Sequence, residues 1–283
     1  MSIFDSFSKK HDYLICVDSD GCVMDTMNCK HFNCFGPCMV KEWGLEAWEA
    51  EILARWNEIN LFSLTRGINR FKGLATALKE IDGKYVKIKG VDALLHWADT
   101  APALSNDGVL KAANEAADED ARLILTKALS WSKAVNAAIV ELDESLKIPF
   151  EGAKEGLAAA HEFADVAMVS SANRDAVEEE WGKFSLLELT DIVLAQDIGS
   201  KAACIAAMLK LGYKAENVLM IGDALGDCEA AEKNGVYYYP ILVNHEKASW
   251  DEAVSTAFNK LKAGDFEDYG KQKKKEFLQN LGG

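Results

Sequence analysis

Two aspartates lie close together in the stretch LICVDSDGCVMDT, which runs from Leu14 to Thr26. Asp18 and Asp20 follow a short apolar segment and are two residues apart. At this spacing, side chains of an extended strand point the same way. Two carboxylates aimed at one point repel each other and raise each other's pKa, so the pair needs either open solvent or a nearby cation. The rest of the chain must distinguish a solvated loop from a binding site.

Two later apolar segments also end in polar side chains. VAMVSSAN contains Ser170 and Ser171, and VLMIGDALGD contains Asp223 and Asp227. Lys201 begins a helical stretch that leads towards the second of these segments. Ligands of open parallel α/β sheets bind beyond the carboxyl ends of the strands. We therefore expect these side chains to meet the two N-terminal aspartates in one crevice.

The predicted crevice combines groups that suit phosphoryl transfer. Several carboxylates at one point need a cation, and a set of oxygen ligands selects Mg²⁺. The Lys201 ammonium and the Ser170 hydroxyl are a point charge and a short donor, as a bound phosphate requires. One carboxylate can then attack phosphorus and form an acyl phosphate. The other can protonate the departing oxygen and later deprotonate the attacking water.

The elements that must position these residues form an α/β pattern. Helical stretches at residues 153–163, 174–182 and 201–211 separate short apolar runs, and the last stretch begins after a Ser200 N-cap and ends at Gly212. This alternation predicts a doubly wound parallel sheet. Its expected strands are YLICV (13–17), VAMVS (166–170), DIVLA (191–195), VLMIG (218–222) and VYYYPIL (236–242), the last near a sheet edge because of Pro240.

The long segment after the first strand is predicted to be an inserted helical domain. Within it, Trp131, Val135, Ile139 and Leu142 recur at helical spacing, which indicates a packing face. We expect residues 11–26 and 150–262 to form the core and residues 27–149 to form a helical cap. Residues 263–283 are expected to be a frayed or peripheral C-terminal tail.

Composition limits the class of protein. The 283 residues are 49% apolar and 27% charged, and 31 basic against 45 acidic side chains give a formal charge of −14. This balance argues against nucleic-acid binding, which uses a basic surface. The sequence has neither an apolar run of the roughly 20 residues that cross a bilayer nor a recognisable signal peptide. We therefore expect a cytoplasmic protein with no membrane partner, and its oligomeric state stays open.

Seven cysteines in a chain of this length favour reduced thiols over a disulfide framework. Four residues, Cys29, His31, Cys34 and Cys38, are grouped closely enough to suggest a metal site. Their spacing lacks the paired C-x-x-C pattern, and no second pair of ligands follows at the usual distance. We interpret them mainly as buried or half-buried thiols, with a structural metal as the alternative.

Four motifs in order resemble those of the haloacid dehalogenase superfamily. Its D-x-D-G motif is matched by Asp18, Asp20 and Gly21, although Cys22 stands where threonine or valine is usual. The strand ending in serine or threonine is matched by Ser170. The third motif, a lysine before the fourth strand, is matched by Lys201, which lacks the following proline that many members of the family have. The G-D-x-x-x-D motif is matched by Gly222, Asp223 and Asp227.

This resemblance implies a Rossmann-like core with an inserted helical cap, and a Mg²⁺-dependent phosphatase or phosphomutase. It implies Asp18 as the nucleophile and Asp20 as the acid/base whose main-chain carbonyl also faces the metal. Asp223 would be a metal ligand, and Asp227 a ligand or the support of one. The expected partner is a small phosphorylated metabolite.

Other activities remain as alternatives to a phosphatase. A phosphomutase needs the same core and differs in whether water or a sugar hydroxyl takes the phosphoryl group. A phosphonatase would need a Schiff-base lysine in the cap. A dehalogenase is disfavoured because the resemblance associates it with loss of the second aspartate, which Asp20 retains. A non-catalytic binding module on the same fold is a further alternative.

One segment of the expected cap is similar to the substrate-specificity loop of β-phosphoglucomutases. It is TRGINRFKGL, from Thr65 to Leu74. The similarity implies that Arg66, Asn69 and Arg70 contact the distal part of a substrate, with Ser171 as a further candidate in the core. The alternative is an ordinary loop before a helix, with its arginines in solvent.

Overall fold

The computed structural model describes residues 3–283, which divide into two compact units. The core unit comprises the described residues up to Met27 together with Ser145–Gly283, and the helical unit comprises Asn28–Glu144. Residues 145–149, expected in the cap, are grouped with the core unit. The reason is local pairing: the Ile148 carbonyl accepts from Asp25 N–H, and Pro149 forms a bridge with Met24.

The core unit contains a five-stranded parallel sheet with the order β3-β2-β1-β4-β5. β1 is central, and its last residue, Val17, pairs with Met168 of β2 and Ile221 of β4. The predicted doubly wound sheet is therefore confirmed, with each predicted strand end within two residues of the observed one. The strands are β1 (Tyr13–Val17), β2 (Ala164–Val169), β3 (Ile192–Leu194), β4 (Val218–Gly222) and β5 (Tyr237–Pro240).

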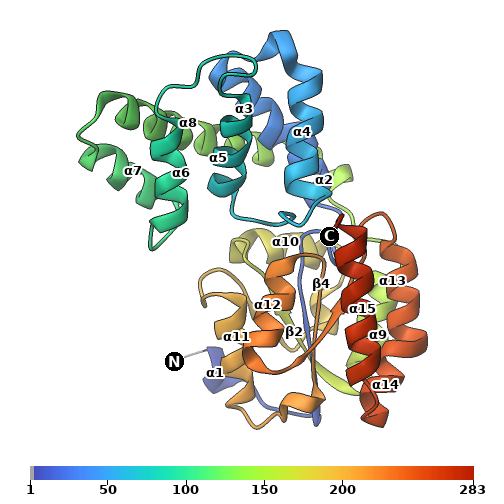
Figure 1. Ribbon diagram of the computed structural model, residues 1–283. Coiled ribbons are helices and arrows are strands. Elements are labelled where there is room, and N and C mark those ends of the chain that lie inside the picture. Colours follow the sequence, from blue (N-terminus) through green and yellow to red (C-terminus); the bar gives the residue numbers. More distant parts are fainter. Residues whose placement is uncertain (1–2) are drawn as a thin grey trace. The chain divides into compact units, whose positions relative to one another are not determined.

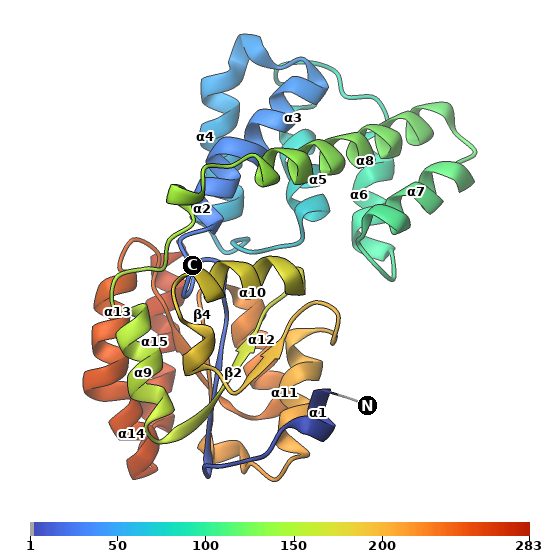
Figure 2. The ribbon, with the colours of Figure 1, turned by 180° about the vertical axis from the view of Figure 1, so that it is seen from behind.

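Helices cover both faces of this sheet (Figures 1 and 2). α11 and α12 pack together on one side, and α9 packs with α13 on the other. The three predicted helices are confirmed as α9, α10 and α11. The helices of the core unit are α1 (Ile3–Ser6), α9 (Ala153–His161), α10 (Arg174–Lys183), α11 (Lys201–Leu209), α12 (Leu225–Asn234), α13 (Glu246–Glu252), α14 (Phe258–Ala263) and α15 (Glu267–Asn280).

The C-terminal segment is a packed helix rather than a frayed one. α15 lies against β5, and its Phe277 is fully buried with an edge-to-face contact to Tyr238. Lys273, only 6% exposed, pairs with Glu252 at 2.7 Å and with Glu276 at 2.5 Å. The lysines around residue 273 make this segment polar on average, so its sequence did not indicate packing. Only one face of the helix is apolar, and that face is buried.

The helical unit has its own core of aromatic side chains. Trp131 makes edge-to-face contacts with Phe35, Trp56 and Phe71. The predicted packing stripe on residues 131–142 is confirmed, since Trp131 and Val135 are fully buried. The helices are α2 (Met27–Lys30), α3 (Gly36–Trp43), α4 (Glu49–Leu61), α5 (Arg70–Ile81), α6 (Val91–Thr100), α7 (Asn106–Glu115) and α8 (Glu119–Val140), with a π-helical turn at His31–Phe35. Across residues 3–283, no helix is sufficiently long and apolar to cross a membrane.

Candidate functional site

Asp18 lies directly beyond the central strand of the core sheet. β1 ends at Val17, and the Asp18 N–H continues the ladder by donating to the Ile221 carbonyl of β4 at 3.0 Å. The residue is only 6% exposed. Its Oδ1 accepts from the Ser19 N–H at 2.8 Å, so the main chain itself orients the carboxylate.

A tight turn separates Asp20 from Asp18. The Ser19 carbonyl accepts from three successive N–H groups, those of Cys22, Val23 and Met24, at 2.9 to 3.3 Å. Gly21 has a φ of 84°, a conformation that glycine adopts without strain. Asp20 is therefore in the turn and not on the strand, and the strand geometry inferred from the two-residue spacing is wrong here. Thr26 Oγ1 donates to Asp20 Oδ1.

Asp223 and Asp227 come from the carboxyl end of β4 and the first turn of α12. Asp227 is fully buried, and its Oδ2 accepts from the Ala224 N–H at 3.1 Å. A negative side chain in the first turn of a helix is favoured by the helix dipole. A Cβ on Gly222 would lie 2.3 Å from Asp227 Cγ, so only glycine allows this approach. Asp223 is 1% exposed.

Lys201 joins the two groups of aspartates. It is the first residue of α11, whose N-cap Ser200 accepts from the Ala203 N–H. Its Nζ lies 2.7 Å from Asp18 Oδ2 and 2.6 Å from Asp227 Oδ1. A lysine at a helix N-terminus is opposed by the helix dipole. The two carboxylates compensate for that cost, which points to a role for Lys201 in the site.

The carboxylates form one buried cluster. Ligand oxygens of Asp18, Asp223 and Asp227 all lie within 4.8 Å of one another. Burial raises the pKa of Asp18 well above its usual range, Lys201 opposes this, and Asp227 and Asp223 raise it further. Burial alone would lower the pKa of Lys201, but Asp18 and Asp227 together raise it. The ammonium therefore stays charged and only partly neutralises the cluster.

The structure bears on the ligand set expected at the aspartates and on the alternative of a metal at the cysteine group. Asp20, expected as a fourth ligand, does not contribute its side chain to the carboxylate cluster. Among residues 3–283, Asp18, Asp223 and Asp227 are the only three His, Cys, Asp or Glu side chains that approach so closely. The grouping of Cys29, His31, Cys34 and Cys38 in sequence is thus not reproduced as a cluster in space. His31 instead stacks on Phe35 and accepts from Trp56 Nε1.

Ser170 and Ser171 follow the strand next to β1. Ser170 comes directly after β2 and is 3% exposed, and its Oγ accepts from the Ala172 N–H at 3.1 Å. This contact leaves the hydroxyl proton for donation to another acceptor. Ser171 is exposed. Both serines therefore lie at the same edge of the sheet as Asp18.

The three candidate substrate residues of the helical unit all make internal contacts. Arg66 is 2% exposed and donates from Nη1 to the Leu61 carbonyl, and Asn69 is the N-cap of α5. Arg70 donates to Ser132 Oγ and Asn136 Oδ1 and lies over the Phe35 ring, so neither arginine is simply in solvent, as the alternative interpretation held. Burial lowers the pKa of Arg70. Whether any of them contacts a substrate stays a prediction.

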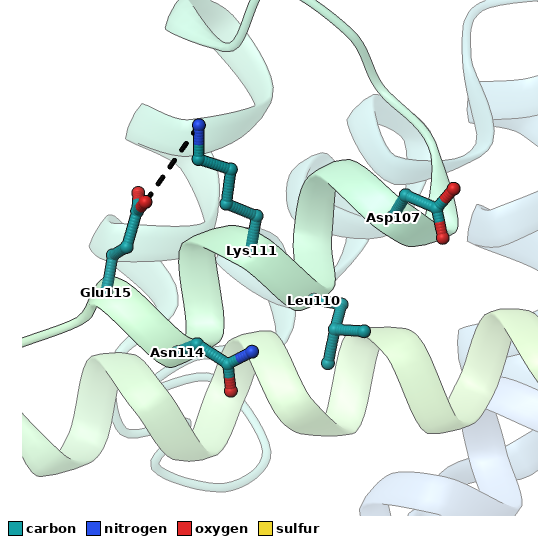
Figure 3. A pocket seen from close by; sticks show the side chains of 5 residues that line it. All are labelled: Asp107, Leu110, Lys111, Asn114 and Glu115. Atoms are coloured by element: carbon teal, nitrogen blue, oxygen red, sulfur yellow. Dashed lines mark ion pairs between the residues drawn. The ribbon is translucent and has the colours of Figure 1, made fainter.

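A shallow hollow on α7 is a separate feature. It has a volume of about 370 Å³ and lies along one helix of the helical unit (Figure 3). Its charged side chains include the Lys111–Glu115 pair, 3.9 Å apart. Such an i, i+4 pair is an ordinary feature of an exposed helix. We therefore assign no chemistry to this hollow, which is lined by Asp107, Leu110, Lys111, Asn114 and Glu115.

Reasoning from the sequence missed three residues that contact the turn after β1. Thr26, the last residue of the stretch LICVDSDGCVMDT, donates to Asp20. Trp181 and Trp250 each donate an indole N–H to this turn. No local signal marks the two tryptophans, because they are more than 150 residues from the turn. The polar Ser19 between the two aspartates is the one hint that a buried donor approaches.

Comparison with known proteins points to one family. The family model described as haloacid dehalogenase-like hydrolase matches residues 103–240, which include Ser170, Lys201, Asp223 and Asp227. Asp18 and Asp20 lie outside the matched range, so their part in the site rests on the geometry above. No curated protein sequence matches the chain significantly.

Two solved structures share the fold. A putative phosphoglycolate phosphatase from Lactobacillus delbrueckii subsp. bulgaricus is 12% identical, with a TM-score of 0.52, covering 82% of this chain and 86% of that one. A haloacid dehalogenase-like family hydrolase from Streptococcus pneumoniae is 13% identical, with a TM-score of 0.50. The match covers 85% of this chain and 90% of that one. At these identities the likeness shows a common fold.

Proposed function

We propose that this chain is a Mg²⁺-dependent phosphatase of the haloacid dehalogenase-like hydrolases, the family whose model matches residues 103–240. Its substrate would be a small phosphate monoester, and Asp18 would carry the phosphoryl group as an aspartyl phosphate between two half-reactions. The buried cluster of Asp18, Asp223 and Asp227 around the Lys201 ammonium is the observation that supports this most directly.

The charge of this cluster calls for a divalent cation. Three carboxylates and the Lys201 ammonium, all largely buried, give this group of four a formal charge of −2 when every member is ionised. Buried charges need partners. The ligand atoms are all oxygens, which Mg²⁺ prefers. Asp18, Asp223 and Asp227, with the Asp20 carbonyl, would hold the ion, which when bound supplies positive charge to the phosphoryl oxygens.

Two side chains are suited to hold the transferring phosphoryl group. Lys201 uses two of its three N–H donors on Asp18 and Asp227, so one is left for a phosphoryl oxygen. Ser170 accepts a hydrogen bond from Ala172 and keeps its own proton to donate. Donors fixed in advance around developing charge lower the barrier without reorganisation in the transition state.

Asp18 is suited to be the nucleophile because its orientation is fixed at both oxygens, by the Ser19 N–H and by Lys201. In the first half-reaction one of its oxygens forms a bond to phosphorus, and the bond from phosphorus to the ester oxygen breaks. In the second, a water oxygen attacks the same phosphorus. The acyl phosphate then releases inorganic phosphate and returns the Asp18 carboxylate.

Asp20 would move the protons of both half-reactions. It first gives a proton to the departing ester oxygen, and the resulting carboxylate then takes a proton from the attacking water. The Thr26 hydroxyl, which donates to Asp20 Oδ1, would keep the acid in one orientation throughout. Its place in the turn, separate from the carboxylate cluster, suits a group that must change its protonation state.

The direct test is hydrolysis of a generic aryl phosphate by the purified protein, with Mg²⁺ and with a chelator. Release of inorganic phosphate only with Mg²⁺ supports the proposal, and an equal rate in chelator contradicts it. A panel of phosphorylated metabolites then identifies the substrate. If a sugar phosphate yields its isomer instead of inorganic phosphate, the enzyme is a mutase and the hydrolytic second half-reaction is wrong.

A further inference from the structure

Two buried tryptophans hold the turn that carries Asp18 and Asp20. Trp181 Nε1 of α10 donates to Ser19 Oγ at 2.8 Å, and Trp250 Nε1 of α13 donates to the Cys22 carbonyl at 3.1 Å. The two tryptophans, Ser19 and Cys22 are each at most 1% exposed. A buried indole N–H that lost its acceptor would be left unsatisfied, so each hydrogen bond fixes both of its partners.

Ser19 connects this anchoring to the nucleophile. Its N–H donates to Asp18 Oδ1, and its carbonyl accepts from the N–H groups of Cys22, Val23 and Met24. The side-chain oxygen is the one remaining polar atom of the residue, and it is held by Trp181. A rotation of Ser19 would therefore turn its N–H away from Asp18 and loosen the turn that sets the position of Asp20.

The two indole rings have little freedom to move. A Cβ on Gly156 would lie 2.2 Å from Trp250 Cε3, so the ring lies directly against the α9 backbone. Trp181 is fully buried in the hydrophobic core of the core unit. Close-packed interiors transmit displacement and do not absorb it. The indoles therefore act as rigid supports for the turn.

We propose that Trp181 is a positioning residue, which acts through Ser19 to hold the Asp18 carboxylate in the orientation needed for attack, while Trp250 fixes the other side of the same turn. The catalytic part of this inference rests on the proposed phosphatase function. The geometric part, that the indoles immobilise residues 19–24, does not depend on it. The experiments below measure the two parts separately.

A double-mutant cycle measures the catalytic part. Trp181→Phe removes the N–H but keeps an aromatic ring, and Ser19→Ala removes the acceptor. We expect each to lower kcat on an aryl phosphate roughly 10- to 100-fold, because small misplacements of a reacting group have effects of this size. KM should change little. The double variant should lose no more than either single variant, since both remove the same hydrogen bond.

Hydrogen exchange measures the geometric part without any activity. In Trp181→Phe and in Ser19→Ala, the amides of Cys22, Val23 and Met24 should exchange about tenfold faster than in the wild type. Tyr213→Phe is the matched control. It removes another buried donor of the core unit, the hydroxyl that donates to Asp165 Oδ2 at 2.5 Å, and Asp165 lies near the amino end of β2, the end opposite Ser170. It should leave both kcat and the exchange of these amides unchanged.

The outcomes separate the possible failures. Unchanged exchange at residues 22–24 in both variants overturns the geometric part. Faster exchange with an unchanged kcat overturns the positioning role, as does a kcat loss that Tyr213→Phe reproduces through general destabilisation. A wild-type protein with no phosphatase activity contradicts the proposed function instead, and the exchange result then still decides whether the indoles hold the turn.

Discussion

The Lys201 ammonium lies 2.7 Å from Asp18 Oδ2, although the two residues are separated by more than half of the chain. Lys201 begins α11 and Asp18 follows β1, and the parallel sheet brings both to the same edge. The side chains of both are largely buried, with exposed fractions of 15% and 8%. In the proposed reaction, Lys201 would hold the attacking carboxylate in place, and the remaining negative charge of the cluster would be balanced by Mg²⁺ before a phosphate binds.

Replacing Asp18 with Asn should abolish turnover and leave the fold intact. The amide is nearly isosteric but cannot form the acyl phosphate. Phosphate release measures turnover, circular dichroism reports the fold, and calorimetry should show that Mg²⁺ still binds. Asp12→Asn, at a side chain that is 85% exposed, is the control and should behave as the wild type. Near-normal turnover in Asp18→Asn rules out this residue as the nucleophile.

Replacing Asp20 with Asn should lower kcat by a factor of roughly 10²–10⁴, the usual size of a proton-transfer contribution. The limb of the pH–rate profile that reports this acid should disappear. Thr26→Val should give a smaller loss, because it removes only the hydroxyl that orients Asp20. A wild-type pH profile and rate in Asp20→Asn excludes it as the acid/base.

Removing divalent metal should stop the reaction, because the carboxylates of Asp18, Asp223 and Asp227 converge and outnumber the Lys201 ammonium that pairs with Asp18. Readdition of Mg²⁺ should restore the rate and raise the melting temperature through binding to the folded state. Ca²⁺ should bind but inhibit, since it accepts more ligands and bidentate carboxylates, which holds the nucleophile in a non-attacking geometry. Full activity in chelator contradicts the metal requirement.

Replacing Arg70 with Ala tests the helical unit. If Arg70 contacts the distal part of the substrate, KM should rise strongly for the true metabolite and barely change for a small aryl phosphate. Its contacts with Ser132 and Asn136 also predict a loss of stability of about 1 kcal/mol. Asn136→Ala removes one of these contacts but keeps the charge, and it separates the two effects. If Arg70→Ala changes KM by the same factor for both substrates, Arg70 has a structural role alone.

Asp191 should make stability depend on pH. Burial alone would raise its pKa, but hydrogen bonds from Lys10 and from the Val166 N–H bring the pKa below the usual value. Its stabilising contribution is therefore fully present above the unfolded pKa, near 3.8, and is lost as pH falls through the lower folded pKa. Asp191→Asn should cost about 2 kcal/mol at pH 7 and progressively less in acid.

Urea titrations at several pH values measure this difference. Asp251→Asn provides the control, because its carboxylate is 60% exposed and pairs only with Lys247 at the surface. Such pairs contribute little. A cost for Asp191→Asn that stays constant from neutral pH into the acid range contradicts the assignment of the stabilisation to the ionised carboxylate.

The sequence alone was sufficient for the sheet and for the order of its chemistry-bearing ends. Apolar runs bounded by glycine and polar residues identify strands because buried parallel strands are apolar on both faces. Ser200 marks the start of α11 because unsatisfied helix N–H groups need a capping side chain, whereas the helix ends at Leu209, three residues before the predicted Gly212. The carboxyl ends of parallel strands share one edge of a sheet, so the sequence alone places Asp18, Ser170 and Asp223 together.

Tertiary structure decided how those residues are placed relative to one another. Side-chain alternation treated Asp18 and Asp20 as equivalent, but the strand ends at Val17 and the turn separates them. The packed state of α15 and the internal contacts of Arg70 were likewise absent from local pattern, since both depend on partners distant in sequence. The hydrogen bond from Trp181 to Ser19 also depends on a distant partner, since the two residues are 162 positions apart. It forms only because the core packs α10 against the turn. Local sequence encodes the elements and their ends, whereas contacts between distant side chains are fixed only when the apolar core excludes water around them.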